Sequence, residues 1–193
     1  FFARTCLPEY FSQVTGDGDV AAQKATQHLI DTGSRRIAFI GGPNHLDMVR
    51  RRKHGYLQAL RENRIPIDRA LVKCGEISKD YAISATNELL ALPSPPDAIL
   101  AFNDIMTFAV FDTIKEHGLK IPDDVAIVGF TDDDTAIHVT PKLTVVADRA
   151  DEQGKKACEL LMRAIKGDKE RYKEIVPMEL ILRDSSDKRK CNK

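Results

Sequence analysis

PDAILAFNDIMTFAVFDTIKEHGLKIPDDVAIVGF, residues 96–130, contains two apolar runs that flank a helical segment. The first run stops at Asn103-Asp104 and the second at Gly129-Phe130-Thr131, and the residues between them predict a largely apolar helix over 105–117. Polar side chains at the carboxyl ends of consecutive parallel strands mark the place where open α/β sheets bind small ligands. This stretch therefore predicts an α/β domain that binds a ligand at one edge of its sheet.

The rest of the chain alternates between short apolar runs and longer amphipathic segments. Strands that alternate with helices of ten or more residues indicate a parallel sheet with helices on both faces. We therefore expect a parallel, doubly wound sheet, with Asp19 as the N-cap of the first helix. Helices are expected over residues 19–31, 47–63, 81–92 and 152–165, and further strands over 36–40, 71–72, 143–146 and 178–182.

The composition argues against several classes of function. The 193 residues are 42% hydrophobic and 30% charged, which is typical of a globular protein, and 29 basic residues balance 29 acidic ones. This balance gives no footprint of nucleic-acid or anionic-membrane binding, and no apolar run approaches the roughly 20 residues that a membrane helix needs. We therefore expect no membrane partner, and no sequence-specific DNA binding by this chain alone.

The four cysteines, Cys6, Cys74, Cys158 and Cys191, are scattered and form neither a C-x-x-C pair nor a zinc-binding spacing. Cys74 at a strand end and Cys158 in a helix suit reduced side chains with an ordinary packing role. Reduced cysteines favour the cytoplasm as the location of the protein. The sequence predicts neither a metal site nor a cofactor.

Catalytic motifs are also lacking. Gly41-Gly42-Pro43 follows a predicted strand but does not match G-x-G-x-x-G, so a dinucleotide-binding fold would lack its phosphate loop. The sequence contains no G-x-S-x-G nucleophile elbow. We therefore predict a binding protein and not an enzyme.

Several short motifs together resemble the effector-binding core of lactose-repressor-like (LacI/GalR) transcriptional regulators. Arg52, Gly55-Tyr56 and Ala59-Leu60 match that family's pattern R-x-x-G-Y-x-x-A-L, and residues 21–43 resemble the helix and strand at the start of its second lobe. Further matches follow in the right order: Pro96-Asp-Ala-Ile99, Asn103-Asp104, Ile121-Pro122-x-Asp124-Val125, Gly129-Phe130, Pro141-x-Leu143-Thr144 and Glu152-x-x-Gly154-x-x-Ala157.

The resemblance implies a periplasmic-binding-protein-like fold, in which three crossovers join two α/β lobes and the ligand lies in the cleft between them. Carried onto this chain, residues 17–147 and 179–193 form a complete C-terminal lobe, and residues 1–16 and 148–177 are remnants of an N-terminal lobe. Most of that N-terminal lobe and a helix-turn-helix would precede Phe1. Because a partial lobe cannot bury its own helix faces, we expect this part of the chain to be marginally stable by itself.

The implied function is that of a small-molecule effector-binding domain in a bacterial DNA-binding transcriptional regulator, with a sugar or sugar derivative as the effector. The effector would close or reorient the two lobes, and a homodimer would contact operator DNA only through the missing N-terminal segment. The alternative is the periplasmic sugar-binding protein of a transporter, which shares the fold. A leader peptide would favour this alternative, and a helix-turn-helix upstream of Phe1 would favour the regulator.

Arg52 is the first candidate for ligand contact. By resemblance it reaches the cleft, where a guanidinium fork suits hydroxyls or a carboxylate; alternatively, it is one more surface charge in the run from Arg50 to Lys53. Asn103 is implied to bind hydroxyls, although it could instead cap the following helix, for which Asp104 is the better candidate. Leu46, Met48 and Ile77 map to positions that line the pocket in relatives, with plain core packing as the alternative.

Two positions depart from the family pattern. Ala3-Arg4 stands where relatives commonly have Asp-Arg, and Gly129-Phe130-Thr131-Asp132 stands where they have Gly-Phe-Asp-Asp. Relatives use both missing carboxylates to accept sugar hydroxyls, whereas Thr131 offers a neutral hydroxyl. The pocket should therefore prefer an effector with fewer free hydroxyls, or an acidic sugar. Asp132, Asp133 and Asp134 could compensate, but a solvated acidic turn is the favoured interpretation.

The helix over residues 105–117 also indicates a homodimer. It is apolar on more than one side, with Phe108 and Phe111 opposite Met106 and Val110, which is more than one sheet contact needs. Relatives pair through this helix and a segment near Ile137, so the expected dimer interface includes Phe108, Phe111 and Ile137. Burial within a single chain is the rival explanation.

Overall fold

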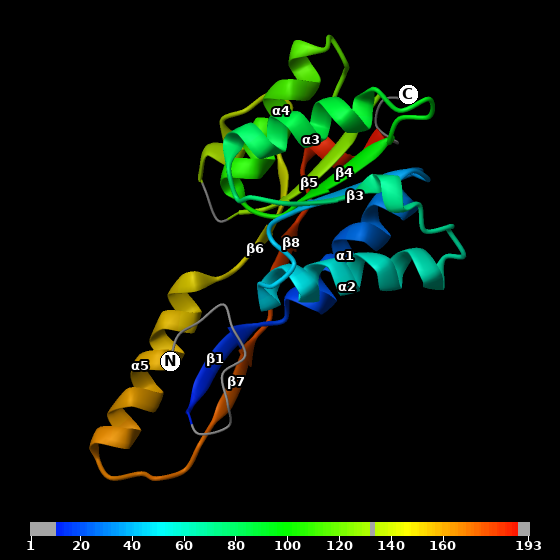
Figure 1. Cartoon of the computed structure of the whole chain (residues 1–193). Coiled ribbons are helices and arrows are strands. Elements are labelled where there is room, and N and C mark those ends of the chain that lie inside the picture. The colour runs from blue at the N-terminus through cyan, green and yellow to red at the C-terminus, as the bar shows by residue number, and fades with distance from the viewer. Residues whose placement is uncertain (1–10, 132–133, 189–193) are drawn as a thin grey trace.

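The computed structural model describes residues 11–131 and 134–188 (Figure 1). Helices α1 to α5 span Gly18–Asp31, Asp47–Glu62, Lys79–Leu90, Asp104–Glu116 and Ala150–Ile165. Strands β1 to β8 span Gln13–Gly16, Ile37–Gly41, Val72–Cys74, Ala98–Ala101, Ala126–Phe130, Thr144–Ala147, Lys173–Val176 and Glu179–Ile181. The predicted helices and strands are confirmed, whereas β1 and β7 were not predicted.

Six strands form the main sheet, in the order β3-β2-β4-β5-β6-β8, and β1 pairs in parallel with β7 to form the small sheet. The neighbouring pairs from β3 to β6 are parallel, as predicted, but β8 is antiparallel to β6. The chain leaves the main sheet at the carboxyl end of β6 and returns along β8 from the same side (Figure 1). Because of this return path, β8 has to run in the opposite direction.

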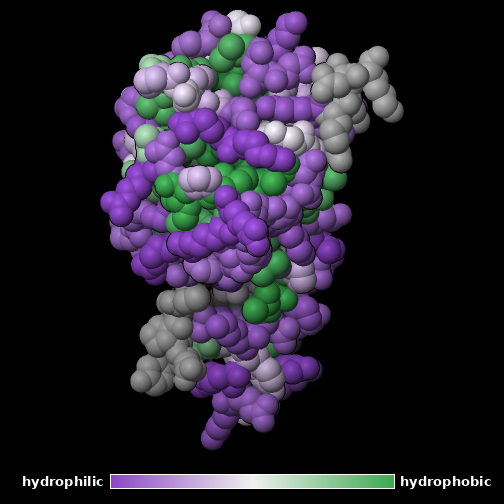
Figure 2. Space-filling view, turned by 90° about the vertical axis from the view of Figure 1, so that its right-hand side faces the viewer, coloured by the Kyte–Doolittle hydropathy of each residue, from purple (hydrophilic) through white to green (hydrophobic). Residues whose placement is uncertain are grey.

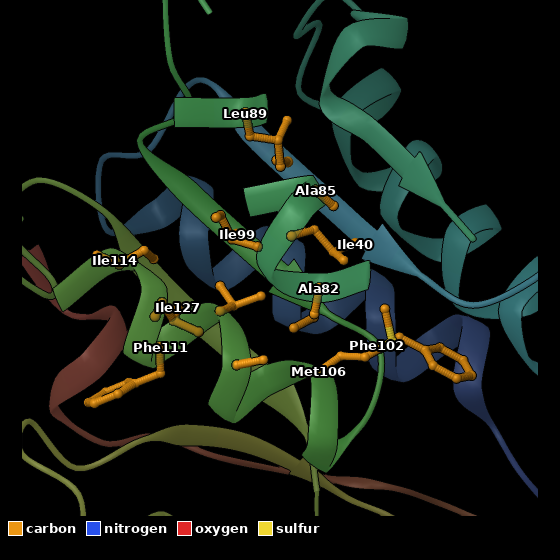
Figure 3. Packing of buried hydrophobic residues seen from close by; sticks show 14 of the residues in the cluster. Ile40, Ala82, Ala85, Leu89, Ile99, Phe102, Met106, Phe111, Ile114 and Ile127 are labelled. Atoms are coloured by element: carbon orange, nitrogen blue, oxygen red, sulfur yellow. The ribbon is translucent and has the colours of Figure 1, made fainter. Parts of the chain in front are cut away.

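Helices cover both faces of the main sheet, so the central strands are buried on both sides and are apolar at nearly every position. Successive side chains of a strand point to opposite faces. Ile40, Ile99 and Ile127 therefore pack towards α3 and α4 (Figure 3), whereas Phe39 and Leu100 pack towards α1 and α2. This double-sided core fixes the register of the sheet and holds its carboxyl edge in place.

The pattern R-x-x-G-Y holds α2 against α1 and the sheet. A Cβ atom on Gly55 would lie 1.9 Å from the carbonyl oxygen of Asp19 in α1, so only glycine permits this approach of the two helices. The Tyr56 hydroxyl donates a hydrogen bond to the Ile37 carbonyl at 2.8 Å, and its ring stacks on Phe39. Burial raises the pKa of Tyr56 well above its usual value. Gly55 and Tyr56 therefore set the position of α2.

The expectation that Asp19 caps α1 is wrong. The helix begins at Gly18 with Asp17 in the N-cap position, and no side chain caps it there. Asp19 lies in the first turn, where its carboxylate accepts a hydrogen bond from Arg51 of α2. Burial raises the pKa of Asp19, but the contacts with Arg51 and with backbone N–H groups lower it by more, so the net shift is downward. The Asp17 carboxylate accepts a hydrogen bond from the backbone N–H of Met178. Asp17 thus joins the start of α1 to the segment before β8.

The small sheet and α5 extend away from the main sheet (Figure 1). In this part α5 contacts β1 and β7, but Leu161, Met162 and Ile165 remain exposed in the described chain. Figure 2 shows that the wide part of the molecule is mostly hydrophilic on the face drawn, with apolar patches in its middle and near the narrowing towards the small sheet. One face of α5 is therefore apolar and exposed in the described chain.

No helix within residues 11–131 and 134–188 combines the length and the hydropathy that crossing a bilayer requires.

The close approach of α1 and α2 leads to a stability prediction. Gly55→Ala should lower the free energy of unfolding by roughly 1–3 kcal/mol, because its Cβ overlaps backbone atoms that cannot rotate away. Gly154→Ala in α5 is the matched control, since a Cβ there meets nothing within 4 Å and helix propensity should stabilise by up to about 1 kcal/mol. Urea unfolding of the purified protein compares the two. Equal effects would show that the approach at Gly55 does not constrain the fold.

Candidate functional site

The candidate site lies at the carboxyl edge of the main sheet. The parallel strands β2, β4, β5 and β6 all end at this edge, so the residues that follow them, Gly42, Phe102, Thr131 and Asp148, come together there. The crossovers to the small sheet leave from the same edge (Figure 1). The site is therefore built mainly by the main sheet, next to the small sheet.

Arg52 is the central side chain of this edge. It extends from α2, and only 2% of it is exposed. Its Nη1 donates a hydrogen bond to the Phe102 carbonyl, and its Nη2 lies 3.3 Å from Oδ1 of Asp148. The guanidinium carbon lies 3.9 Å from the ring centroid of Phe130 and 5.1 Å from that of Phe102. Arg52 therefore connects the ends of β4, β5 and β6.

This environment fixes the orientation of the guanidinium and compensates its charge. A cation over an aromatic face gains up to about 2 kcal/mol when it is desolvated. A buried guanidinium also requires a compensating negative charge, and the Asp148 carboxylate supplies it. The interpretation of Arg52 as an ordinary surface charge is therefore wrong. Arg50 is exposed and Arg51 half-buried, and they pair with Asp47 and Asp19.

Asn103 follows β4 and is the N-cap of α4. Its Oδ1 accepts a hydrogen bond from the backbone N–H of Met106 at 3.1 Å. The expectation that Asp104 would cap this helix is wrong, because Asn103 has the extended backbone that an N-cap needs and Asp104 already lies in the first turn. The Asn103 side chain remains half-buried at the edge of the sheet, with an amide nitrogen that can donate a hydrogen bond.

Thr131 follows β5 and is buried, and its backbone N–H donates a hydrogen bond to the Val146 carbonyl at 3.1 Å. Leu46, Met48 and Ile77 are all half-buried and pack against the core cluster on the α3 and α4 side. Ile77 also closes over Gly42, where an added Cβ atom would meet Ile77 Cγ1 at 2.7 Å. Leu46 and Ile77 are aliphatic and Met48 carries a thioether, so none of the three offers an aromatic face for stacking.

Asp148 and Gln153 contribute to the site but were missed from the sequence. Asp148 directly follows β6, and its carbonyl accepts a hydrogen bond from Nε2 of Gln153, a buried polar residue of α5. The rule that selected Asn103 and Thr131, a polar residue after a parallel strand, also selects Asp148. Gln153 carries no comparable signal, because a glutamine in the first turn of a helix is usually solvated.

The proposed dimer residues have different surroundings. Phe111 is 2% exposed and belongs to the core cluster beside the sheet (Figure 3), so burial within one chain explains it. Phe108 is half-buried, and Ile137 is 42% exposed. Ile105, at the start of α4, is 53% exposed and was not predicted. Among the proposed dimer residues Ile137 is therefore the most exposed, and Ile105 adds an exposed apolar side chain at the start of α4.

Other predicted residues have less to contribute. Ala3, Arg4, Cys6, Asp132, Asp133 and Cys191 lie outside the described residues. Cys74 is half-buried, as a packing role requires, whereas Cys158 is exposed on α5, so a packing role for it within this chain is wrong. Within the described parts of the chain, no group of three or more His, Cys, Asp or Glu side chains is placed to hold a metal ion.

Comparisons with known proteins agree on one family. The sequence model described as a periplasmic binding protein-like domain matches residues 26–186. The transcriptional regulator CelR of Thermobifida fusca is 34% identical over 178 residues, which are 92% of this chain and 52% of CelR. The repressor PurR of Photobacterium profundum is 32% identical over 163 residues, 83% of this chain and 48% of PurR. The chain thus spans about half the length of these curated relatives.

The structural comparison gives the same result. The structure of a CelR–cellobiose complex superposes with a TM-score of 0.89 at 33% identity, and the match covers 95% of this chain and 57% of that one. The two chains therefore share their topology over nearly the whole length of this chain. The similarity therefore extends to the main sheet and to the small sheet.

The two possible roles of Asn103 can be separated by a pair of variants. Asn103→Ala should lower the free energy of unfolding by about 0.5–2 kcal/mol because the Met106 N–H loses its partner. Asn103→Asp should retain nearly all of the stability, since a carboxylate oxygen caps equally well, while it removes the amide donor. Chemical denaturation measures both changes. An equal loss of stability in the two variants would contradict the capping role.

Proposed function

This chain belongs to the LacI/GalR family of transcriptional regulators, in which it corresponds to the effector-binding core, and we propose that it binds a small sugar or sugar derivative that controls DNA binding by the whole regulator. The observation that supports this most is the buried Arg52 guanidinium, held at the carboxyl edge of the main sheet by Phe102, Phe130 and Asp148. The cellobiose bound to CelR supports a saccharide as the class of effector.

The effector would lie between two lobes. We assign residues 17–147 and 179–193 to the C-terminal lobe, and residues 1–16 and 148–177 to part of the N-terminal lobe. In this arrangement Arg52, Asn103 and Thr131 contact the effector from the main sheet, and Leu46, Met48 and Ile77 supply the apolar wall. An effector changes the lobe arrangement only if its affinity differs between two arrangements.

The remaining parts of the function lie outside this chain or at its surface. Operator contacts would come from a helix-turn-helix segment outside the described residues, and the protein would act in the cytoplasm as a homodimer without catalysing a reaction. A periplasmic transport protein is the second candidate because it shares the fold. It is less favoured, because the CelR and PurR relatives are helix-turn-helix-type regulators.

Arg52 and Thr131 should have separate effects on effector binding. Arg52→Ala in the full-length protein should weaken binding roughly 30-fold or more, since removal of one partner of a buried charge-assisted hydrogen bond costs roughly 2–5 kcal/mol. Arg50→Ala is the matched control, because Arg50 is an exposed neighbour that pairs with Asp47 and should not affect binding. Thr131→Asp should shift the preference towards neutral saccharides with more free hydroxyls.

A thermal-shift screen of neutral and acidic saccharides on the full-length protein identifies an effector, and calorimetry then measures its affinity for each variant. Undiminished binding by Arg52→Ala would contradict the assigned site. If a plain neutral hexose stabilises the protein best and Thr131→Asp leaves that preference unchanged, the specificity assigned to Thr131 is wrong.

The homodimer prediction concerns the surface around α4. Lys115 near the end of α4 donates a hydrogen bond to the Thr140 carbonyl, so the segment that carries Ile137 lies beside this helix. Ile137→Asp in the full-length protein should weaken dimerisation roughly tenfold or more, because it places a charge in an apolar interface. Ile67→Asp, at a similarly exposed isoleucine elsewhere, is the control. Sedimentation of the unmodified full-length protein as a monomer at micromolar concentration would contradict the proposed dimer.

A further inference from the structure

Asp148 connects the two parts of the molecule through Arg52. Its carboxylate lies 3.3 Å from Nη2 of Arg52 on α2, while its backbone carbonyl is bound by Gln153 of α5. The next residue, Arg149, adopts the left-handed conformation, with φ 52° and ψ 49°, and α5 begins at Ala150. The Asp148 side chain therefore binds α2, which packs on the main sheet, whereas its backbone belongs to the crossover that leads to the small sheet.

We propose that Asp148 is a displaceable internal counter-ion of Arg52, and that a carboxylate on the effector takes its place and thereby releases the crossover. This inference rests on the proposed function, because it assumes that Arg52 contacts the effector. It goes further in naming a carboxylate as the effector group that faces Arg52, and in naming the contact whose loss couples binding to movement of the small sheet.

The two partners of this ion pair differ in burial. The Arg52 side chain is 2% exposed, whereas the Asp148 side chain is 34% exposed. Loss of a buried ion pair costs several kcal/mol, so a neutral ligand that displaces Asp148 forfeits the ion pair with Arg52 and offers no charge in return. A carboxylate can replace it at constant charge. Asp148, already partly in water, regains its hydration when it is released.

Arg52 is also held in place by more than Asp148. Its Nη1 is bound to the Phe102 carbonyl, and the rings of Phe130 and Phe102 lie against the guanidinium. The distance of 3.3 Å to Asp148 is longer than the 2.7–2.9 Å that is typical of a charge-assisted hydrogen bond. The guanidinium would therefore keep its orientation during an exchange of anions, and the incoming carboxylate would find the donor in position.

The position of Asp148 in the chain links this exchange to the small sheet. The crossover from β6 to α5 is one of the connections between the main sheet and the small sheet (Figure 1). Because Gln153 holds the Asp148 carbonyl, the backbone of Asp148 should move with α5 when its carboxylate leaves Arg52. Binding of a ligand carboxylate to Arg52 thus releases the crossover between β6 and α5.

Formate is the probe for the exchange, because it carries a carboxylate and little else. Asp148→Ala in the full-length protein removes the Asp148 carboxylate from Arg52, so formate should bind roughly tenfold or more tightly than in the wild type, measured against chloride at equal ionic strength. The double variant with Arg52→Lys should lose this gain, because lysine lacks the fixed planar fork. Equal formate affinity in wild type and Asp148→Ala would overturn the proposal.

Asp148→Asn provides a second variant of the same shape without the charge. It should favour glucuronate over glucose by roughly tenfold or more relative to the wild type, and amide hydrogen exchange over residues 148–153 should be faster in this variant than in the wild type. An unchanged glucuronate-to-glucose ratio together with unchanged exchange would overturn the proposal. Failure of both Asp148 variants to fold would also overturn it, since a displaceable counter-ion cannot be indispensable to the fold.

The anion exchange and the saccharide function can fail independently. If a saccharide binds the wild type and Arg52→Ala abolishes that binding, but Asp148→Ala gains no affinity for formate, the exchange is refuted and the proposed function stands. If formate binds more tightly to Asp148→Ala while no saccharide binds any form, the exchange stands and the saccharide function is refuted.

Discussion

The desolvated charge of Arg52 is the constraint on which the arrangement of the site depends. A guanidinium that is almost fully buried needs a fixed carbonyl, an aromatic surface and a negative partner, and Phe102, Phe130 and Asp148 supply these three. Each of them follows or ends a different strand of the main sheet. The charge therefore holds together three loops that the sheet alone would only bring near one another.

The parallel sheet explains why the site is where it is. Parallel strands end at a common edge, and right-handed crossovers place helices over both faces, so the loops at that edge are left uncovered. The chain uses the same edge for its connections to the small sheet, including the β6 crossover and the return along β8 (Figure 1). A ligand at this edge can therefore contact the main sheet and influence the crossovers at the same time.

Much of the main sheet could be predicted because its strands are buried on both faces. The runs at Ile37–Gly41 and Ala126–Phe130 are apolar throughout, which identifies them without any partner information. β1 and β7 are short and interrupted by polar residues, so neither contains an apolar run that would identify it, and they were missed. The direction of β8 depends on how the chain returns from the small sheet, which local sequence does not encode.

The site was predicted less completely than the fold. Arg52 was found through a family pattern and not through its local sequence, where it is one of three consecutive arginines. Which of them is buried depends on the rotation of α2, and that rotation is set by the contacts of Gly55 and Tyr56. The pairing of Arg52 with Asp148 joins residues far apart in the chain, and only the register of β4, β5 and β6 brings them together.

A crystal structure of the full-length protein with the saccharide that stabilises it most is the most direct test of the role of Arg52. We predict that an oxygen atom of the ligand lies about 3 Å from the Arg52 guanidinium, within hydrogen-bond distance and between the two sheets. A ligand bound elsewhere, with the Arg52 contacts to Phe102 and Asp148 unchanged from the ligand-free protein, would contradict this role.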